Sequence, residues 1–188
     1  MKKKLLITIL ILTTNFIFSQ SVLDLDIKNG FRHFKLGSSP NQIKNIKKTS
    51  NQHSKNPNVA EFLYVGDDII YISNVKVGDI KLSFFKNKLF NIAIEFGDLM
   101  QSKNFEEEDY MAILSSLERT YGKDWSILSD KDNVIIDGAQ WVGKNATLEL
   151  CRLDFSNSKK FPKDYDFISG FIAVYDNKLS NEMYSTDF

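Results

Sequence analysis

The sequence predicts an α+β fold in which tandem helix-plus-antiparallel-strand repeats pack their helices on one face of a sheet. Three observations carry this prediction. Residues 80–84 and 90–96 alternate apolar and polar side chains, which is the period of half-buried strands. Residues 104–122 place apolar side chains at helical spacing. Hydrophobic residues make up 43% of the chain, enough to build a core without disulfides.

The first twenty residues are typical of a secretory signal peptide. Three lysines at positions 2–4 precede the uncharged, mostly apolar run of residues 5–18, and small or polar residues follow at 19–21. The apolar run is shorter than the roughly 18 residues of a spanning helix. We therefore expect residues 1–20 to be cleaved. Residues 21–188 would then form one α+β domain in the periplasm or outside the cell.

Charge and cysteine content exclude several classes of protein. Without its leader the chain has 21 basic and 24 acidic residues, a balance that gives no electrostatic reason to bind nucleic acid or anionic lipid. Cys151 is the single cysteine, so no intramolecular disulfide can form. No cysteine follows the leader to carry a lipid. We therefore expect neither a nucleic-acid partner nor a stable membrane anchor.

The first elements after the leader are an edge strand and a helix. Residues 31–36 form the expected strand, and a turn at 37–38 follows. Ser39 and Gln42 can close a capping box, and Pro40 stands at the first helical position, where its missing N–H costs nothing. A helix is therefore expected from Ser39, with a polar loop over 49–57.

Residues 61–96 are expected to form a strand meander. Residues 61–65 and 69–77 are rich in β-branched and aromatic side chains, and the two alternating segments follow them. The segment 86–88 separates the last two strands as a turn, because asparagine tolerates the left-handed conformation. This pair is the clearest hairpin in the chain.

The second helix is expected from a cap at Asn104, with Glu107 closing a capping box. Acidic residues crowd its first turns, where they complement the helix dipole. Gly122 is placed to end the helix in the left-handed region. The stripe that should face the core consists of Tyr110, Ile113, Leu114, Leu117 and Tyr121.

The remainder of the chain is expected to return to strands. These strands are residues 125–128, 134–141, 147–155 and 171–175, with a loop over 156–166 and a loose tail over 180–188. The order of elements then repeats, with halves at residues 31–97 and 104–179. Val77-Gly78 and Val142-Gly143 stand at similar places in the two halves.

No string of residues predicts catalysis, a metal or a cofactor. Residues 138–145 approach a phosphate-binding loop, but Asn145 lacks the hydroxyl that would bind Mg²⁺, and a strand follows where a helix is needed. His33 and His53 have no second histidine, cysteine or acid at ligand spacing. We assign no catalytic residue, no metal ligand and no cofactor.

Aromatic side chains on or beside loops of the second half are the candidate binding residues. Such side chains favour contact with a protein or a carbohydrate when they are exposed. The candidates are Trp141, Phe161, Tyr165 and Phe167.

Residues 34–43, Phe-Lys-Leu-Gly-Ser-Ser-Pro-Asn-Gln-Ile, resemble the opening of small exported bacterial domains. They are similar to the SmpA/OmlA type of outer-membrane assembly lipoprotein and to the β-lactamase-inhibitor-protein type. The resemblance implies a compact α+β binding domain without catalysis. The chain departs from the first type in lacking a lipid-accepting cysteine, and from the second in having no identifiable inhibitor loop. The leader and the Lys/Asn/Ile-rich composition resemble exported proteins of Bacteroidetes-type bacteria.

The leading hypothesis is an exported, non-enzymatic binding protein of the bacterial cell envelope, whose partner is a protein or another envelope component. Two alternatives remain open. One is an envelope hydrolase whose residues converge only in three dimensions. The other is a carbohydrate or small-ligand binder that uses Trp141 and the loop aromatics.

Overall fold

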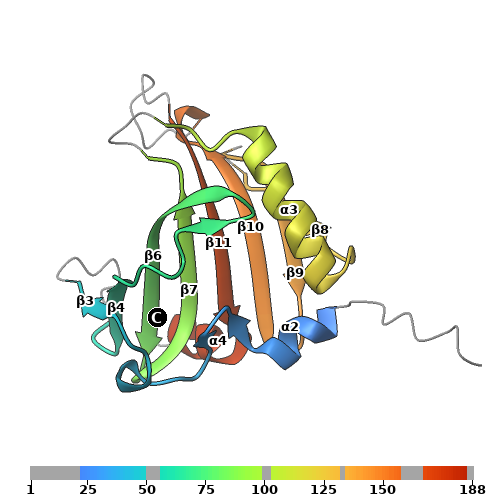
Figure 1. The fold of residues 1–188 in the computed structure, drawn as a ribbon. Coiled ribbons are helices and arrows are strands. Elements are labelled where there is room, and N and C mark those ends of the chain that lie inside the picture. The colour runs from blue at the N-terminus through green and yellow to red at the C-terminus, as the bar shows by residue number, and fades with distance from the viewer. Residues whose placement is uncertain (1–21, 50–55, 99–102, 132–133, 158–166, 186–188) are drawn as a thin grey trace, which may run out of the picture.

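A curved antiparallel sheet organises the computed structural model, which describes residues 22–49, 56–98, 103–131, 134–157 and 167–185 (Figure 1). From edge to edge, the strands are β3 (Ile46–Lys48), β4 (Val59–Tyr64), β6 (Val75–Phe85), β7 (Lys88–Phe96), β11 (Ile168–Asp176), β10 (Ala146–Asp154), β9 (Ile135–Val142) and β8 (Ser126–Ile127). Strand β5 (Tyr71–Ile72) pairs with the start of β6. The α+β class is confirmed.

The strand order runs inward along the chain from both edges. Strands β3, β4, β6 and β7 lead from one edge to the middle, and β8, β9, β10 and β11 lead there from the other. The two halves meet where β7 and β11 pair antiparallel, with Ala93 opposite Ala173. Residues about 80 positions apart in the sequence therefore become neighbours in the middle of the sheet.

The β6–β7 hairpin is the one that the alternating pattern predicts. Lys86 and Asn87 join its strands with φ angles of 48° and 65°, both in the left-handed region. A second tight turn at Ser73 and Asn74, also left-handed, joins β5 to β6. The single strand expected over residues 69–77 is thus a hairpin, because the chain reverses at Asn74.

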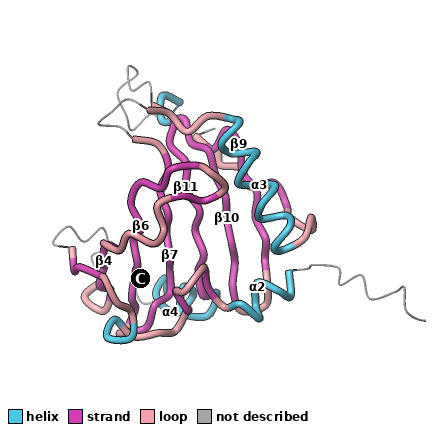
Figure 2. The backbone as a smooth tube through the Cα atoms, in the orientation of Figure 1, coloured by secondary structure: helices cyan, strands magenta, loops and turns pink. Residues whose placement is uncertain are grey.

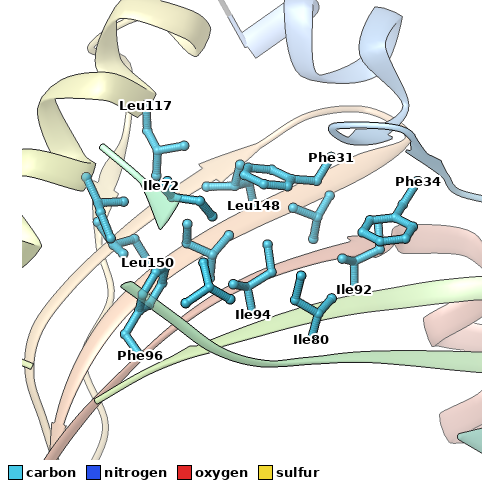
Figure 3. Close-up of a cluster of buried hydrophobic side chains, with 14 of the residues drawn as sticks. Phe31, Phe34, Ile72, Ile80, Ile92, Ile94, Phe96, Leu117, Leu148 and Leu150 are labelled. Atoms are coloured by element: carbon cyan, nitrogen blue, oxygen red, sulfur yellow. The ribbon is translucent and has the colours of Figure 1, made fainter. Parts of the chain in front are cut away.

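Apolar side chains on one face of the sheet, here called the inner face, form the main core. Helices α2 (Val22–Lys28) and α3 (Glu107–Tyr121) cover this face together with β5 and the hairpin of β1 (Gly30–Phe31) and β2 (Phe34–Lys35) (Figures 1 and 2). Figure 3 shows Leu117 of α3 pointing toward Ile72 and Leu148, above a layer that includes Ile92 and Ile94. The complete apolar stripe predicted for the second helix is buried.

The N-cap of helix α3 lies two residues after the expected cap. Glu106 takes the N-cap position and Asp109 completes its capping box, whereas the Asn104 side chain accepts a hydrogen bond from the amide of Ile168. Gly122 ends the helix at φ 83°, as predicted.

The prediction of a helix that begins at Ser39 is wrong. Ser39 and Gln42 do form the capping box, but the result is one 3₁₀ turn, η1 (Pro40–Gln42), and Ile43 is already extended. Asn45 then adopts a left-handed φ of 56°, and the following residues pair with β4 as strand β3. The cap is a local signal, and sheet pairing overrides the continuation of the helix.

The opposite, outer face of the sheet carries helix α4 (Asn177–Ser185), which lies behind the lower ends of the strands in Figure 1. Its Leu179 and Met183 form a second apolar cluster with Val59, Phe85 and Phe90. Two expectations are thereby corrected: helices pack on both faces, and residues 180–185 are helical rather than a loose tail.

Candidate functional site

A pocket of about 680 Å³ opens on the outer face between α4 and strands β7, β9, β10 and β11. Its size falls within the range of small-molecule sites in proteins. The walls come from both halves of the chain, because β7 and β11 are adjacent in the sheet. This pocket is the candidate site.

Glu149 of β10 organises the polar floor of the pocket. Its Oε1 atom accepts hydrogen bonds from Gln140 Nε2 at 2.7 Å and from the Tyr175 hydroxyl at 2.8 Å. Gln140 is opposite Glu149 in the sheet register, and Tyr175 is displaced by two positions on β11. The three side chains point outward because each occupies the polar phase of its strand.

Burial and the hydrogen bond to Glu149 together raise the pKa of Tyr175 to about 12. The phenol is therefore protonated at physiological pH and donates a hydrogen bond to the carboxylate. Glu149 Oε1 is occupied by two donors in the unliganded protein. Its Oε2 atom has no hydrogen-bond partner among the described residues.

Asn177, the first residue of α4, fixes one end of the pocket. Its Oδ1 accepts from the Thr147 hydroxyl at 2.8 Å, and its Nδ2 donates to the Gly143 carbonyl at 3.0 Å. Its backbone amide donates to the Asn145 carbonyl at 2.9 Å. These bonds join the helix to the β9–β10 turn, so this wall of the pocket is held from two sides.

Asn91 of β7 lines the pocket opposite Tyr175 in the register. Its Oδ1 atom is buried and has no hydrogen-bond partner among the described residues. An unpaired buried amide oxygen costs on the order of 1–3 kcal/mol, so natural folds rarely retain one without a reason. A ligand that donates a hydrogen bond there would remove this cost.

Most of the pocket lining is uncharged. Glu149 is the single charged residue among the described residues that line the pocket, and the others are amides, hydroxyls, aromatics and small apolar side chains. Val142 and Tyr184 stand at the rim, with exposed fractions of 57% and 61%. The arrangement can bind through hydrogen bonds and apolar contact. Its lining residues offer no histidine, cysteine or second carboxylate for acid–base chemistry.

Neither Trp141 nor Phe167, the two described residues among the aromatic candidates, lines this pocket. Trp141 is fully buried on the inner face, where its Nε1 donates to the Gly122 carbonyl at 2.9 Å, so this candidate presents no exposed ring to a partner. Phe167 is also buried, with 9% of its surface exposed. Phe161 and Tyr165 lie outside the described residues.

The sequence pattern that indicates the pocket is the alternation of strand residues on either side of Trp141. Strand alternation directs Ala139 and Trp141 inward and therefore directs Gln140 and Val142 outward to the pocket. The outward phase of β10 is likewise occupied by Thr147 and Glu149. The polar phase of these strands, rather than their aromatic residues, marks the site.

A histidine–carboxylate pair occurs elsewhere in the fold. His33 Nδ1 lies 3.3 Å from Asp68 Oδ2, and the Tyr64 hydroxyl donates to Asp68 Oδ1. That hydrogen bond from Tyr64 lowers the pKa of Asp68. The His33 and Asp68 side chains are 45% and 56% exposed, and neither bonds to a serine or cysteine among the described residues. The pair is a surface contact between two turns. His53 lies outside the described residues.

Three further observations concern the part of the chain that the structure describes. It contains no group of three or more His, Cys, Asp or Glu residues that could hold a metal ion. None of its helices is both long enough and apolar enough to cross a membrane. Cys151 is fully buried, and this burial raises the pKa of its thiol to about 12.

Comparison with known proteins adds no relative: no family model matches the chain, and no curated protein or solved structure matches it significantly.

Proposed function

We propose that this chain is an exported, non-enzymatic binding domain of the bacterial cell envelope, and that it holds its ligand in the outer-face pocket. The observation that carries the proposal is the buried Asn91 Oδ1, an acceptor without a partner among the described residues, beside the Glu149 network. The amino-terminal pattern supports export to the periplasm or the medium.

The composition of the pocket favours binding over hydrolysis. A glycosidase needs two carboxyl groups on either side of the scissile bond, and a serine or cysteine hydrolase needs a base beside its nucleophile. The lining residues include one carboxylate, Glu149, and its Oε1 already accepts from Gln140 and Tyr175. Such a group orients a ligand more readily than it shuttles protons.

We further propose that the fold consists of two tandem units, residues 31–97 and 104–179. The inward strand order from both edges and the antiparallel β7–β11 junction support this arrangement. The units differ in their helical part, because α3 precedes the strands of the second unit, whereas the single turn η1 precedes those of the first. The pocket would then have formed at the junction of the two units.

The test compares the purified protein with two glutamate variants. All three are used as they are isolated, with or without residues 1–20. Glu149→Gln alters the pocket, and Glu95→Gln is the matched control, because Glu95 pairs with Lys81 at 2.6 Å and does not line the pocket. Thermal unfolding is measured with low- and high-molecular-weight fractions of an envelope extract. A fraction that contains the ligand should raise the Tm of wild type and Glu95→Gln but not of Glu149→Gln.

The same three proteins are assayed against ester, glycoside and peptide substrates. Turnover that disappears in Glu149→Gln would establish an enzyme and refute the proposal. Equal stabilisation of all three proteins would place binding away from the pocket. Mass spectrometry of the native amino terminus tests export, and retention of residues 1–20 would contradict it.

A further inference from the structure

We infer that the outer-face pocket binds a neutral, hydroxyl-rich ligand of mono- or disaccharide size. The inference rests on the binding function proposed above and specifies the class of ligand. It follows from three properties of the pocket: which hydrogen-bonding atoms are free, how the charge is distributed, and where the apolar surface lies.

The unpaired acceptor atoms of the pocket favour a ligand that donates hydrogen bonds. Asn91 Oδ1 and Glu149 Oε2 are both acceptors without a partner among the described residues. The side-chain amide of Asn181 also lines the pocket and can both donate and accept. A sugar hydroxyl donates one hydrogen bond and accepts others, so adjacent hydroxyls can satisfy a carboxylate oxygen and an amide together.

The charge distribution disfavours anions. No lysine or arginine is among the described residues that line the pocket, so the negative charge of Glu149 would repel a carboxylate or a phosphate. Gln140 and Tyr175 already donate hydrogen bonds to that carboxylate, and the neighbouring polar groups are uncharged. Neutral polar side chains of this kind bond hydroxyl groups without requiring an opposite charge.

The pocket also offers apolar surface, against which the carbon face of a sugar ring can pack. Tyr184 on α4 and Val142 on β9 stand exposed at the rim, and Phe90 and Ala173 contribute to the wall. Rings with polar edges and apolar faces combine both kinds of contact in one small area. A volume of about 680 Å³ accommodates one or two sugar rings with water.

The experiment titrates the purified protein with neutral sugars, namely glucose, galactose, N-acetylglucosamine, maltose and cellobiose, by saturation-transfer NMR and calorimetry. Glucuronate and glucosamine serve as anionic and cationic counterparts of the same size. Concentrations reach about 20 mM, at which even a millimolar Kd is detected. We expect at least one neutral sugar to bind saturably, glucuronate to bind about tenfold more weakly than glucose, and glucosamine to bind no more tightly than glucose.

Two variants test whether the side-chain oxygens of Asn91 and Glu149 bind the sugar. Asn91→Leu and Glu149→Gln should each weaken sugar binding by about tenfold or more, while Glu95→Gln binds as the wild type does. Asn91→Leu should also raise the Tm of the unliganded protein, because it removes a buried acceptor that has no partner. A purely structural role for Asn91 would lower the Tm instead.

Each failure has a distinct meaning. If no neutral sugar binds, or if glucosamine binds more tightly than glucose through Glu149, the assignment of a neutral ligand is overturned. If the envelope fraction still stabilises the wild type and not Glu149→Gln, the proposed binding function survives that result. If neither sugar nor extract distinguishes the Glu149 variant, both proposals fall together.

Discussion

Replacing Asp26 by alanine tests how the amino-terminal helix is attached to the sheet. The carboxylate of Asp26, on α2, accepts hydrogen bonds from the backbone amides of Lys144, Asn145 and Ala146 at 2.8, 2.8 and 3.0 Å. These amides belong to the β9–β10 turn, about 120 residues further along the chain. One side chain therefore closes a very long loop.

The magnitude follows from the three bonds. A hydrogen bond to a charged group contributes about 1.5–3 kcal/mol when buried, but the amides of Lys144 and Asn145 are exposed and can bond to water instead. We therefore expect Asp26→Ala to lower the free energy of unfolding by about 2 kcal/mol. In a domain of this size, that loss corresponds to a decrease in Tm of about 4–8 °C.

The decrease in the free energy of unfolding caused by Asp26→Ala should depend on pH. Burial alone would raise the pKa of Asp26, but the three backbone hydrogen bonds outweigh it and lower the pKa below the usual 3.8. A carboxylate with a lower pKa in the folded state stabilises the fold above the unfolded pKa, and this stabilisation is lost as the pH falls through the folded pKa. The difference between wild type and Asp26→Ala should therefore be constant near neutral pH and shrink in acid.

Chemical denaturation of wild type, Asp26→Ala and Asp26→Asn at several pH values measures this directly. Asp26→Asn keeps one acceptor oxygen without the charge, so it should lie between the other two at neutral pH. Equal stability of wild type and Asp26→Ala at neutral pH would refute the attachment. A difference that persists unchanged into strong acid would show that packing, rather than the ionised carboxylate, holds α2.

Three further variants or reagents test the core. Cys151, with its pKa raised to about 12 by burial, should react with a thiol reagent at pH 8 at least about a hundredfold more slowly than in denaturant; fast labelling would contradict its burial. Gly170→Ala should cost about 1–3 kcal/mol in denaturant unfolding, because a Cβ would collide with the ring of Phe105; an unchanged midpoint would be contrary to this packing. Trp141→Phe should lower stability by about 1–3 kcal/mol in the same assay, because the Gly122 carbonyl loses its buried donor, and no loss would argue against that bond.

The elements that the sequence predicted well are those that a local pattern of residues specifies. The β6–β7 hairpin follows from alternation and from the left-handed preference of Asn87. Helix α3 follows from its apolar stripe and from Gly122 at its end. In each case the local pattern and the tertiary contacts agree, so reading the pattern is sufficient.

The wrong predictions concern segments whose structure depends on residues far away in the chain. Helix α4 has few apolar residues of its own, and its Leu179 and Met183 acquire meaning only against Val59, Phe85 and Phe90 from the first half. Its amino terminus is capped by Asp176, whose Oδ1 accepts from the Leu179 amide at 2.8 Å. A short polar segment of this kind reads as a tail until the surface beneath it is known.

The pocket could not be predicted for the same reason. Asn91 and Tyr175 are brought together by the pairing of β7 with β11, which no local pattern specifies. The preference for aromatic residues also directed attention to Trp141, whose burial removes it from the surface. The outward phase of β9 and β10 was visible as alternation, but the sequence does not say which face is solvent and which is roofed by α4.

Alternate residues of each central strand face the core and the pocket. Substitutions can therefore distinguish the residues needed for folding from those needed for ligand binding. Along β10, Leu148 and Leu150 belong to the core, while Thr147 and Glu149 belong to the pocket. A library of single substitutions sorted for folded protein should be depleted at the first pair, and the same library sorted for ligand retention should be depleted at both pairs. The positions lost only in the second sort would outline the ligand's footprint, one residue out of phase with the core.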